Sequence, residues 1–259
     1  MKIVVLVKQV PDTWEERKLD TQSGVLDRDA NERVLDETNE RALELALSYK
    51  DSHKGTEVVA LSMGPEAVTQ GLRKALSMGA DSALHVQDDA LAGADIGWTA
   101  EVLAAGLRRT GFDLVIAGNE STDGRGGVVP ALIAEHLGLP HLTSLNSAEI
   151  AESFISGERG AEDGTLMVRA SLPAVISITE RLPEARFPSF RGIISAKKKP
   201  LTVLSLNDLQ PLAAGGPGYG RSTVLTTEKR PARTAGKKIL DEGNAGVELA
   251  EFLVAGRLI

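Results

Sequence analysis

The sequence predicts an α/β protein of three layers, with a mainly parallel sheet between two layers of helices and a C-terminal arm. Short, almost wholly apolar runs alternate with segments whose apolar residues recur at helical spacing. Strands that are apolar on both faces are typical of a parallel sheet covered by helices on each side. A glycine-rich segment between one such run and the next helix adds the signature of a ligand site at the sheet edge.

Four apolar runs predict the central strands, at residues 2–7, 57–62, 83–86 and 113–117. Apolar residues at helical spacing predict the helices between and after these strands. The residues concerned are Ala42, Leu45, Ala46 and Tyr49; Val68, Leu72, Ala75 and Leu76; Ile96, Ala100, Leu103 and Leu107; and Leu132, Ile133 and Leu137. Gly138 and Pro140 end the last of these helices. Residues 164–178 supply two further strands that meet near Pro173 without a helix between them.

Two domains are expected, an α/β domain at residues 1–222 and a C-terminal arm at residues 223–259. The segment 211–220 is rich in Gly and Pro, which predicts a linker or mobile loop. The arm ends in a helical pattern around Leu249, Phe252 and Leu253. A segment of this kind has too little apolar surface to fold alone, so its helix packs either on its own domain or on a partner.

Composition excludes several functions. A net charge of −7 and an aromatic content of 3% argue against nucleic-acid binding, which favours a basic face and stacking rings. Zero cysteines exclude disulfides, thiol catalysis and iron–sulfur ligation by this chain, and four scattered histidines predict no metal site. No stretch approaches the roughly 20 apolar residues of a membrane span. We therefore expect no membrane insertion and, without a secretory signal, a location in the bacterial cytoplasm.

The glycine-rich segment at 118–129, GNESTDGRGGVV, is the candidate ligand site. It lies between an apolar strand and a helix, where open parallel sheets bind ligands and where a helix N-terminus favours an anion. Gly124, Gly126 and Gly127 leave backbone N–H groups open to a phosphate, and side chains such as Ser121, Thr122 and Arg125 offer further contacts. The alternative interpretation is a flexible loop whose glycines serve only turn geometry.

The same segment narrows the choice of nucleotide. No Gly-Lys-Ser/Thr follows it, so it is not a P-loop, and it lacks the G-x-G-x-x-G pattern of dinucleotide enzymes. No acidic residue ends the second strand, at 62–65, to bind a ribose hydroxyl. A short anion site of this type fits a monophosphate or one end of a dinucleotide.

A second informative segment spans residues 179–199 and carries two of the five phenylalanines, Phe187 and Phe190. Pro183 and Pro188 stiffen it, and three arginines are interspersed among the aromatic residues. Aromatic residues among arginines are typical of an interface hot spot. The alternative is that both rings fold back onto the core.

Short stretches in and before this segment follow one order: PAVIS at 173–177, RL at 181–182, EARF at 184–187, GI at 192–193 and AKKK at 196–199. That order resembles the beta subunits of electron transfer flavoproteins, and the resemblance covers nearly the whole chain. It implies a fold like that of adenine nucleotide alpha hydrolases. It also implies a recognition loop at about 181–199, in which Phe187, Phe190 and Arg191 dock partner dehydrogenases and Phe190 is the anchor.

The resemblance further implies structural AMP bound by this chain, and FAD held mainly by an alpha subunit. Leu6 and Met63 are then apolar walls for adenine, and Asp36 and Asn39 bind the base or its ribose. Asp36 is equally well explained as a helix N-cap. The implied AMP-site residues are Leu6, Asp36, Glu37, Thr38, Asn39, Met63, Gly118, Asn119, Glu120, Ser121, Thr122, Asp123, Gly124, Arg125, Gly126, Gly127, Val128 and Val129.

On this resemblance the chain is an electron-carrier subunit of a heterodimer and not an enzyme, with no catalytic residues of its own. The implied partners are the alpha subunit, acyl-CoA and other flavin dehydrogenases, and an electron transfer flavoprotein oxidoreductase that leads to the respiratory chain. The C-terminal arm, with a turn at 233–236, wraps across the alpha subunit. Two alternatives remain: a beta subunit of an electron-bifurcating flavoprotein with FAD in the same site, and a stand-alone adenine-nucleotide-binding protein.

Overall fold

The computed structural model describes residues 1–209, 222, 224–228, 230–233, 235, 236 and 238–259. The chain divides into two compact units, Met1–Leu225 and Thr226–Ile259. The linker predicted at 211–220 and part of the turn predicted at 233–236 lie outside the described residues.

Among the described residues, the main sheet of the first unit has nine strands, in the order β11–β5–β4–β1–β6–β10–β7–β8–β9. Neighbouring strands from β11 to β7 run parallel, and β7, β8 and β9 pair antiparallel. Two short strands, β2 and β3, form a separate antiparallel pair. The strands are β1 (Lys2–Leu6), β2 (Gln9–Pro11), β3 (Arg33–Leu35), β4 (Glu57–Met63), β5 (Ser82–Val86), β6 (Leu114–Gly118), β7 (His141–Ile150), β8 (Phe154–Ala161), β9 (Gly164–Ser171), β10 (Ala174–Ile178) and β11 (Leu201–Leu204).

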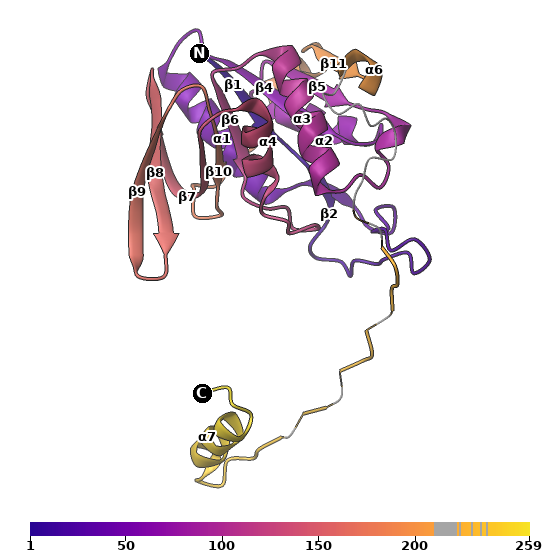
Figure 1. Ribbon diagram of the computed structural model, residues 1–259, viewed down its shortest axis with the longest axis vertical. Coiled ribbons are helices and arrows are strands. Elements are labelled where there is room, and N and C mark those ends of the chain that lie inside the picture. Colours follow the sequence, from indigo (N-terminus) through magenta and orange to yellow (C-terminus); the bar gives the residue numbers. More distant parts are fainter. Residues whose placement is uncertain (210–221, 223, 229, 234, 237) are drawn as a thin grey trace. The chain divides into compact units, whose positions relative to one another are not determined.

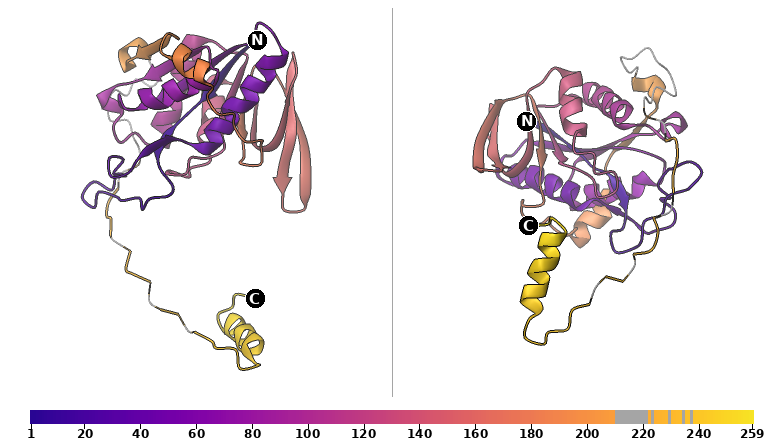
Figure 2. Two further views of the ribbon diagram at one scale, coloured as in Figure 1. Left: turned by 180° about the vertical axis from the view of Figure 1, so that it is seen from behind. Right: turned by 60° about the horizontal axis from the view of Figure 1, so that its bottom comes forward.

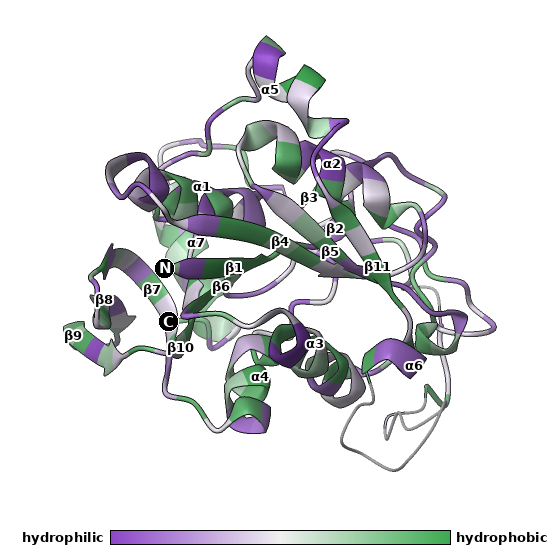
Figure 3. Cartoon of the chain, turned by 90° about the horizontal axis from the view of Figure 1, so that it is seen from above, coloured by the Kyte–Doolittle hydropathy of each residue, from purple (hydrophilic) through white to green (hydrophobic). Residues whose placement is uncertain are grey.

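Helices cover both faces of this sheet (Figure 1). One face carries α1, α2 and α5, and the other carries α3, α4 and α6, as the view in Figure 3 shows. Their bounds are α1 (Glu37–Ser52), α2 (Val68–Met78), α3 (Ile96–Thr110), α4 (Val129–Leu137), α5 (Phe190–Ala196) and α6 (Leu206–Leu209), with a 3₁₀ turn at Asp89–Leu91. The predicted three-layer α/β fold is therefore confirmed.

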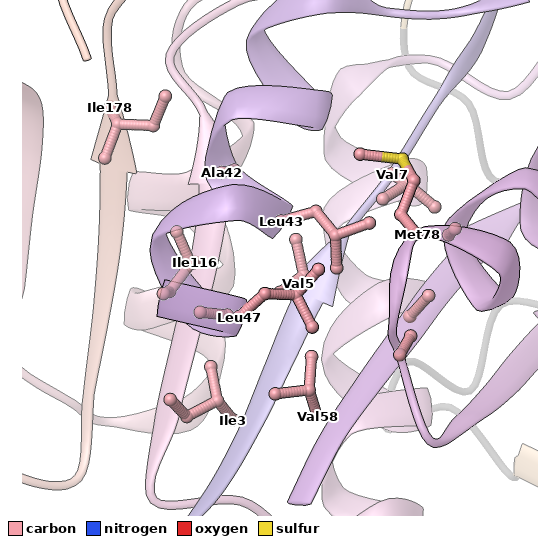
Figure 4. Packing of buried hydrophobic residues seen from close by; sticks show 14 of the residues in the cluster. Ile3, Val5, Val7, Ala42, Leu43, Leu47, Val58, Met78, Ile116 and Ile178 are labelled. Atoms are coloured by element: carbon pink, nitrogen blue, oxygen red, sulfur yellow. The ribbon is translucent and has the colours of Figure 1, made fainter. Parts of the chain in front are cut away.

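The core follows from the alternation of side chains along each strand. In β1, Ile3 and Val5 face the layer of α1 and α2, whereas Val4 and Leu6 face the layer of α3 and α4. Figure 4 shows the first layer, where Leu43 and Leu47 of α1 meet Ile3, Val5 and Val58 from two strands. Each fully buried side chain of this size stabilises the fold by about 1.5–3 kcal/mol.

The strand order also determines where a ligand fits. The chain passes from β1 to β4 and β5 on one side of β1, and then crosses through α3 to β6 on the other side. The order therefore reverses between β1 and β6, which leaves a crevice at their carboxyl ends. Leu6 and Gly118 are the last residues of these two strands.

The predicted strands and helices all occur, with ends shifted by a few residues. Five strands were not predicted. Three of them, β2, β3 and β11, have only three or four residues each. The other two, β7 and β8, form with β9 an antiparallel extension of the sheet (Figure 2). In β7 and β8, buried residues alternate with more exposed ones and β8 contains two glycines, so the apolar runs that mark the central strands are absent. The segment at 179–199 is also more regular than expected, because α5 begins at Phe190 within it.

The second unit contains α7 (Ala245–Ala255), the helix predicted near the end of the chain. None of its residues is buried in the described part of the chain, and Phe252 and Val254 are among those exposed. That the arm packs on another subunit stays a prediction.

No helix in the described part of the chain combines the length and apolar character needed to cross a membrane. Within the same residues, no group of three or more His, Cys, Asp or Glu side chains is arranged to hold a metal ion.

Candidate functional site

The glycine-rich loop at 119–128, called here the nucleotide loop, starts where β6 touches the first turn of α1. Gly118 ends β6, and a Cβ atom there would lie 2.6 Å from Asn39 Nδ2 and 2.9 Å from Thr38 Oγ1. Contacts below 3.0 Å are essentially never made by a Cβ atom. Only glycine therefore allows the strand to pass so close to the helix start.

Asp36 joins α1 to this loop. It is the N-cap of α1, where its Oδ1 accepts hydrogen bonds from the Thr38 N–H (3.1 Å) and hydroxyl (2.6 Å). The Oδ2 atom of Asp36 accepts two bonds from Thr122, one from the Thr122 N–H at 2.8 Å and one from the Thr122 hydroxyl at 3.1 Å. The hydrogen bond from the Thr38 N–H confirms the N-cap interpretation, and the Asp36 side chain is almost fully buried. A direct contact of Asp36 with a nucleotide stays a prediction.

A buried carboxylate fixes the middle of the nucleotide loop. The Asp123 side chain is 1% exposed and receives Lys8 Nζ at 2.8 Å and Arg28 at 2.7 Å. Burial alone would raise the pKa of Asp123, but the hydrogen bonds from Lys8, Ser121 and Arg28, with the Lys8 charge, hold it well below its usual value. The carboxylate is therefore ionised under all ordinary conditions and ties the loop to both cations.

The hydroxyls expected to bind phosphate already have partners inside the protein. Ser121 Oγ accepts from Lys8 Nζ at 3.1 Å, and Thr122 Oγ1 accepts from Arg17 at 2.9 Å. Arg17 also donates to the Thr122 and Pro11 carbonyls. These groups shape the loop, and phosphate contacts by Ser121 and Thr122 remain a prediction.

The last part of the loop has the free donors that an anion requires. Val128 precedes α4 without a side-chain cap, and the N–H groups of Gly126, Gly127 and Val128 donate to no partner within the described residues. Gly127 adopts φ +65°, which suits glycine. Arg125 has φ +47°, and in the described part of the chain its guanidinium makes no ion pair or hydrogen bond. Backbone donors at a helix N-terminus beside an unpaired cation fit a phosphate group.

The other predicted residues surround this loop. Leu6 is buried at the end of β1, and Met63, at the end of β4, packs partly buried against the same apolar cluster. Asn39 accepts the Lys8 N–H at 2.7 Å, the Glu120 carbonyl accepts from Thr38, and Glu37 pairs with Arg41. The structure therefore brings the ends of β1, β4 and β6 together with the N-termini of α1 and α4.

An unsatisfied atom at the start of the loop also favours a ligand. Asn119 Oδ1 is buried, with no hydrogen-bond partner among the described residues, while the Asn119 N–H donates to the Ile178 carbonyl at 2.8 Å. Leaving a buried carbonyl oxygen unpaired costs about 1–3 kcal/mol. A bound polar group would remove that cost, so the residues present fit a nucleotide.

The segment at 179–190, called here the docking loop, leaves the neighbouring strand β10. Its two rings are the most exposed phenylalanines of the described residues, with Phe187 94% and Phe190 81% accessible. The alternative that they fold back onto the core is therefore wrong. Arg191 follows on α5 and forms no hydrogen bond or ion pair within the described residues.

The lysine run that follows is not uniformly free. Lys199 Nζ donates to the Leu76 carbonyl at 2.9 Å and the Ala80 carbonyl at 2.6 Å, at the C-terminal end of α2. Burial lowers the pKa of Lys199 below its usual value. Lys197 and Lys198 remain exposed.

Sequence reasoning missed Lys8, Arg17 and Arg28, which hold the nucleotide loop in shape. Lys8 directly follows an apolar strand, and this position was the only available signal. Arg17 and Arg28 lie in the irregular segment between β2 and β3. Their partners in the nucleotide loop, Thr122 and Asp123, are more than 90 residues away. Nothing in their local sequence predicts those partners.

Comparison with known proteins identifies the family of this chain. A family model described as the electron transfer flavoprotein domain matches residues 23–209. The electron transfer flavoprotein subunit beta of Mycobacterium tuberculosis (strain ATCC 25618 / H37Rv) is 51% identical over 268 residues, and the match covers 99% of each chain. The chain belongs to the family of electron transfer flavoprotein beta subunits.

Other members of the family match as completely. The subunit beta of Mycobacterium leprae (strain TN) is 50% identical over 264 residues and 99% of each chain. The caffeyl-CoA reductase-Etf complex subunit CarD of Acetobacterium woodii is 35% identical over 258 residues, which cover 98% of this chain and 97% of that protein. Members of this family are electron carriers, so the chain is an electron-carrier subunit rather than an enzyme.

Proposed function

We propose that this electron-carrier subunit binds AMP as a structural ligand in the crevice between β1 and β6. The observation that carries the proposal is the set of N–H groups at 126–128, which have no partner within the described residues and precede the N-terminus of α4. Asp36 holds the loop at Thr122, and Lys8 and Arg28 hold it at Asp123. A ligand at 126–128 does not need to displace these contacts.

A mononucleotide fits the chemistry of this crevice. One helix N-terminus and the Arg125 guanidinium, which has no partner in the described part of the chain, suit one phosphate group. Leu6 and Met63 offer an apolar surface for a base. The buried Asn119 Oδ1 is an acceptor for a base or ribose donor. The residues proposed to hold AMP are Leu6, Met63, those at 36–39 and those at 118–129.

The chain acts, in this proposal, together with an alpha subunit that holds most of an FAD. FAD supplies the redox chemistry when bound, and this chain supplies the scaffold and a docking surface. Phe190 anchors the docking loop in acyl-CoA and other flavin dehydrogenases, with Phe187 and Arg191 beside it. Electrons then pass to an electron transfer flavoprotein oxidoreductase and the respiratory chain, and the heterodimer itself works in the bacterial cytoplasm. The exposed apolar residues of α7 favour an arm that packs on the alpha subunit.

Nucleotide analysis tests this proposal. The chain is co-purified with its alpha subunit, denatured, and the released nucleotides are quantified by chromatography. We expect AMP and FAD in equal amounts. No AMP from a correctly assembled, FAD-containing heterodimer would contradict the proposal.

A second candidate is a bifurcating beta subunit that holds a second FAD in the same crevice. A protein named as a subunit of a caffeyl-CoA reductase-Etf complex is 35% identical, so members of the family occur in more than one kind of complex. The same assay separates the candidates, because two FAD per heterodimer and no AMP would identify the bifurcating type. A stand-alone adenine-nucleotide-binding protein would instead bind its nucleotide as a monomer or homodimer, which size-exclusion chromatography of the singly expressed chain would reveal.

A further inference from the structure

The docking loop is exposed but it is not loosely attached. Residues 179–189 form no helix or strand, yet their backbone is fastened to α1 at two places. Arg41 donates to the Leu182 carbonyl, and the Leu182 side chain is buried in the core. Four residues later, Arg186 forms the second attachment.

The second attachment is a multiple hydrogen bond between Arg186 and Glu44. Arg186 Nε lies 2.7 Å from Glu44 Oε2 and its terminal nitrogen 2.8 Å from Oε1, in a fork-to-fork arrangement. The backbone N–H of Arg186 donates to the same carboxylate at 3.0 Å. Asp51 accepts a further bond from the guanidinium at 2.8 Å, and Ser48 donates to Glu44 at 2.9 Å.

The four α1 residues involved share one stripe of the helix. Arg41, Glu44, Ser48 and Asp51 follow each other at spacings of three and four, which places them on one face. The Glu44 side chain is only 14% exposed, and that of Arg186 is 33% exposed. Burial alone would raise the pKa of Glu44, but the bonds from Arg186 and Ser48 lower it, so the pair stays charged at neutral pH.

This contact fixes the residue directly before the exposed rings. Glu44 binds the backbone N–H of Arg186 and also the Nε and a terminal nitrogen of its guanidinium. The backbone is therefore fixed in position directly before Phe187. Pro188 restricts the next backbone angle, and Ser189 caps α5 by accepting the Gly192 N–H at 3.0 Å. Gly192 in turn lies so close to α2 that a Cβ atom would be 2.3 Å from the Ser77 carbonyl oxygen.

We propose that the Arg186–Glu44 pair is a positioning device, which pre-organises the docking loop with Phe187 and Phe190 facing outward and so strengthens partner docking. The inference rests on the docking role proposed above. An exposed loop that is ordered before association loses less conformational entropy when it binds, so its affinity is higher at the same contact area. Neither residue touches the partner in this proposal, and both act through the loop.

The test uses the heterodimer with the variants Glu44→Gln and Arg186→Gln. Hydrogen–deuterium exchange without partner should become faster at 183–190 and stay unchanged in the nucleotide loop. In a dehydrogenase-coupled assay, the KM for the heterodimer should rise about threefold to tenfold, with kcat unchanged. A rise of this size is expected if one or two more side chains must be ordered on binding. The double variant should raise KM no more than Arg186→Gln alone, because Arg186→Gln already removes the contact with Glu44.

Glu40→Gln is the matched control, since Glu40 lies on the same helix and pairs with Lys74 instead of the docking loop. It should change neither exchange at 183–190 nor KM. Unchanged hydrogen–deuterium exchange at 183–190 in Glu44→Gln would overturn the inference. The inference would also be overturned if Glu44→Gln exchanged faster but kept its KM, while Phe190→Ala raised the KM. If neither Glu44→Gln nor Phe190→Ala alters KM, the docking function itself is wrong, and the inference fails with it.

Discussion

The nucleotide loop and the docking loop start side by side and yet present opposite chemistry. They follow the neighbouring strands β6 and β10, are joined by the bond from the Asn119 N–H to the Ile178 carbonyl, and both rest on α1. The nucleotide loop engages the side chains of Ser121, Thr122 and Asp123 internally, and its N–H groups at 126–128 have no partner among the described residues. The docking loop engages its backbone and Arg186 internally and leaves two rings free. In the functions proposed above, the same supporting helix prepares one loop for an anion and the other for an apolar surface.

The largest effect on stability is expected at the start of the nucleotide loop. Gly118→Ala places a Cβ atom within 3.0 Å of Asn39 and Thr38, so it should lower the free energy of unfolding by about 3 kcal/mol. The measurement is urea denaturation followed by circular dichroism. Gly124→Ala is the control, because its Cβ atom would approach Ser121 Oγ only to 3.5 Å. Equal stability of both variants would show that β6 and α1 are not in the tight contact described.

A smaller loss of stability is expected from Asp123→Asn. The amide keeps the shape of the side chain but removes the negative charge between Lys8 and Arg28, which should cost about 2 kcal/mol. The folded-state pKa of Asp123 is depressed, so the carboxylate's contribution is complete above its ordinary pKa of 3.8 and decreases as the pH falls below that value.

The pH profile distinguishes this explanation from a general loss of packing. The difference in unfolding free energy between the original chain and Asp123→Asn should be constant from pH 5 to 7. It should shrink when the pH drops below about 4, because the unfolded carboxyl group then binds a proton. A difference that stays the same at low pH would mean that charge is not the cause.

The smallest effect on stability is expected from Phe190→Ala, although its functional effect should be large. The ring is 81% exposed, so the free energy of unfolding should change by less than about 0.5 kcal/mol. The KM for a partner dehydrogenase should rise about tenfold, as expected of an interface anchor, with flavin content and heterodimer assembly intact. Unchanged transfer kinetics would remove the anchor role and leave the contrast between the two loops without a function.

The central part of the fold was predictable because its strands are buried on both faces. Runs such as KIVVLV and DLVIA contain almost no polar residue, and the glycines and prolines around them mark the helix ends. The strands β7 and β8 escaped prediction because buried residues alternate with more exposed ones along much of their length, so neither contains a continuous apolar run. The start of α5 was hidden by Pro188, although Ser189 as an N-cap was a usable signal.

The location of the candidate site was more predictable than its internal contacts. Local sequence alone was enough to recognise both segments, one by its glycines between a strand and a helix and the other by its two phenylalanines. The ion pairs of Asp123 with Lys8 and Arg28, and of Arg186 with Glu44, join residues 95 to 142 positions apart. Such pairs depend on the three-dimensional arrangement of strands, so the pattern around each residue does not reveal them.

The stripe of Arg41, Glu44, Ser48 and Asp51 on α1 has a consequence for protein engineering. A chimera that receives only the segment 179–199 from another family member would separate Arg186 from the helix that orients it. The transplanted loop would keep its aromatic residues but lose their fixed direction. Exchange of partner preference between family members therefore requires α1 and the loop to be moved as one unit.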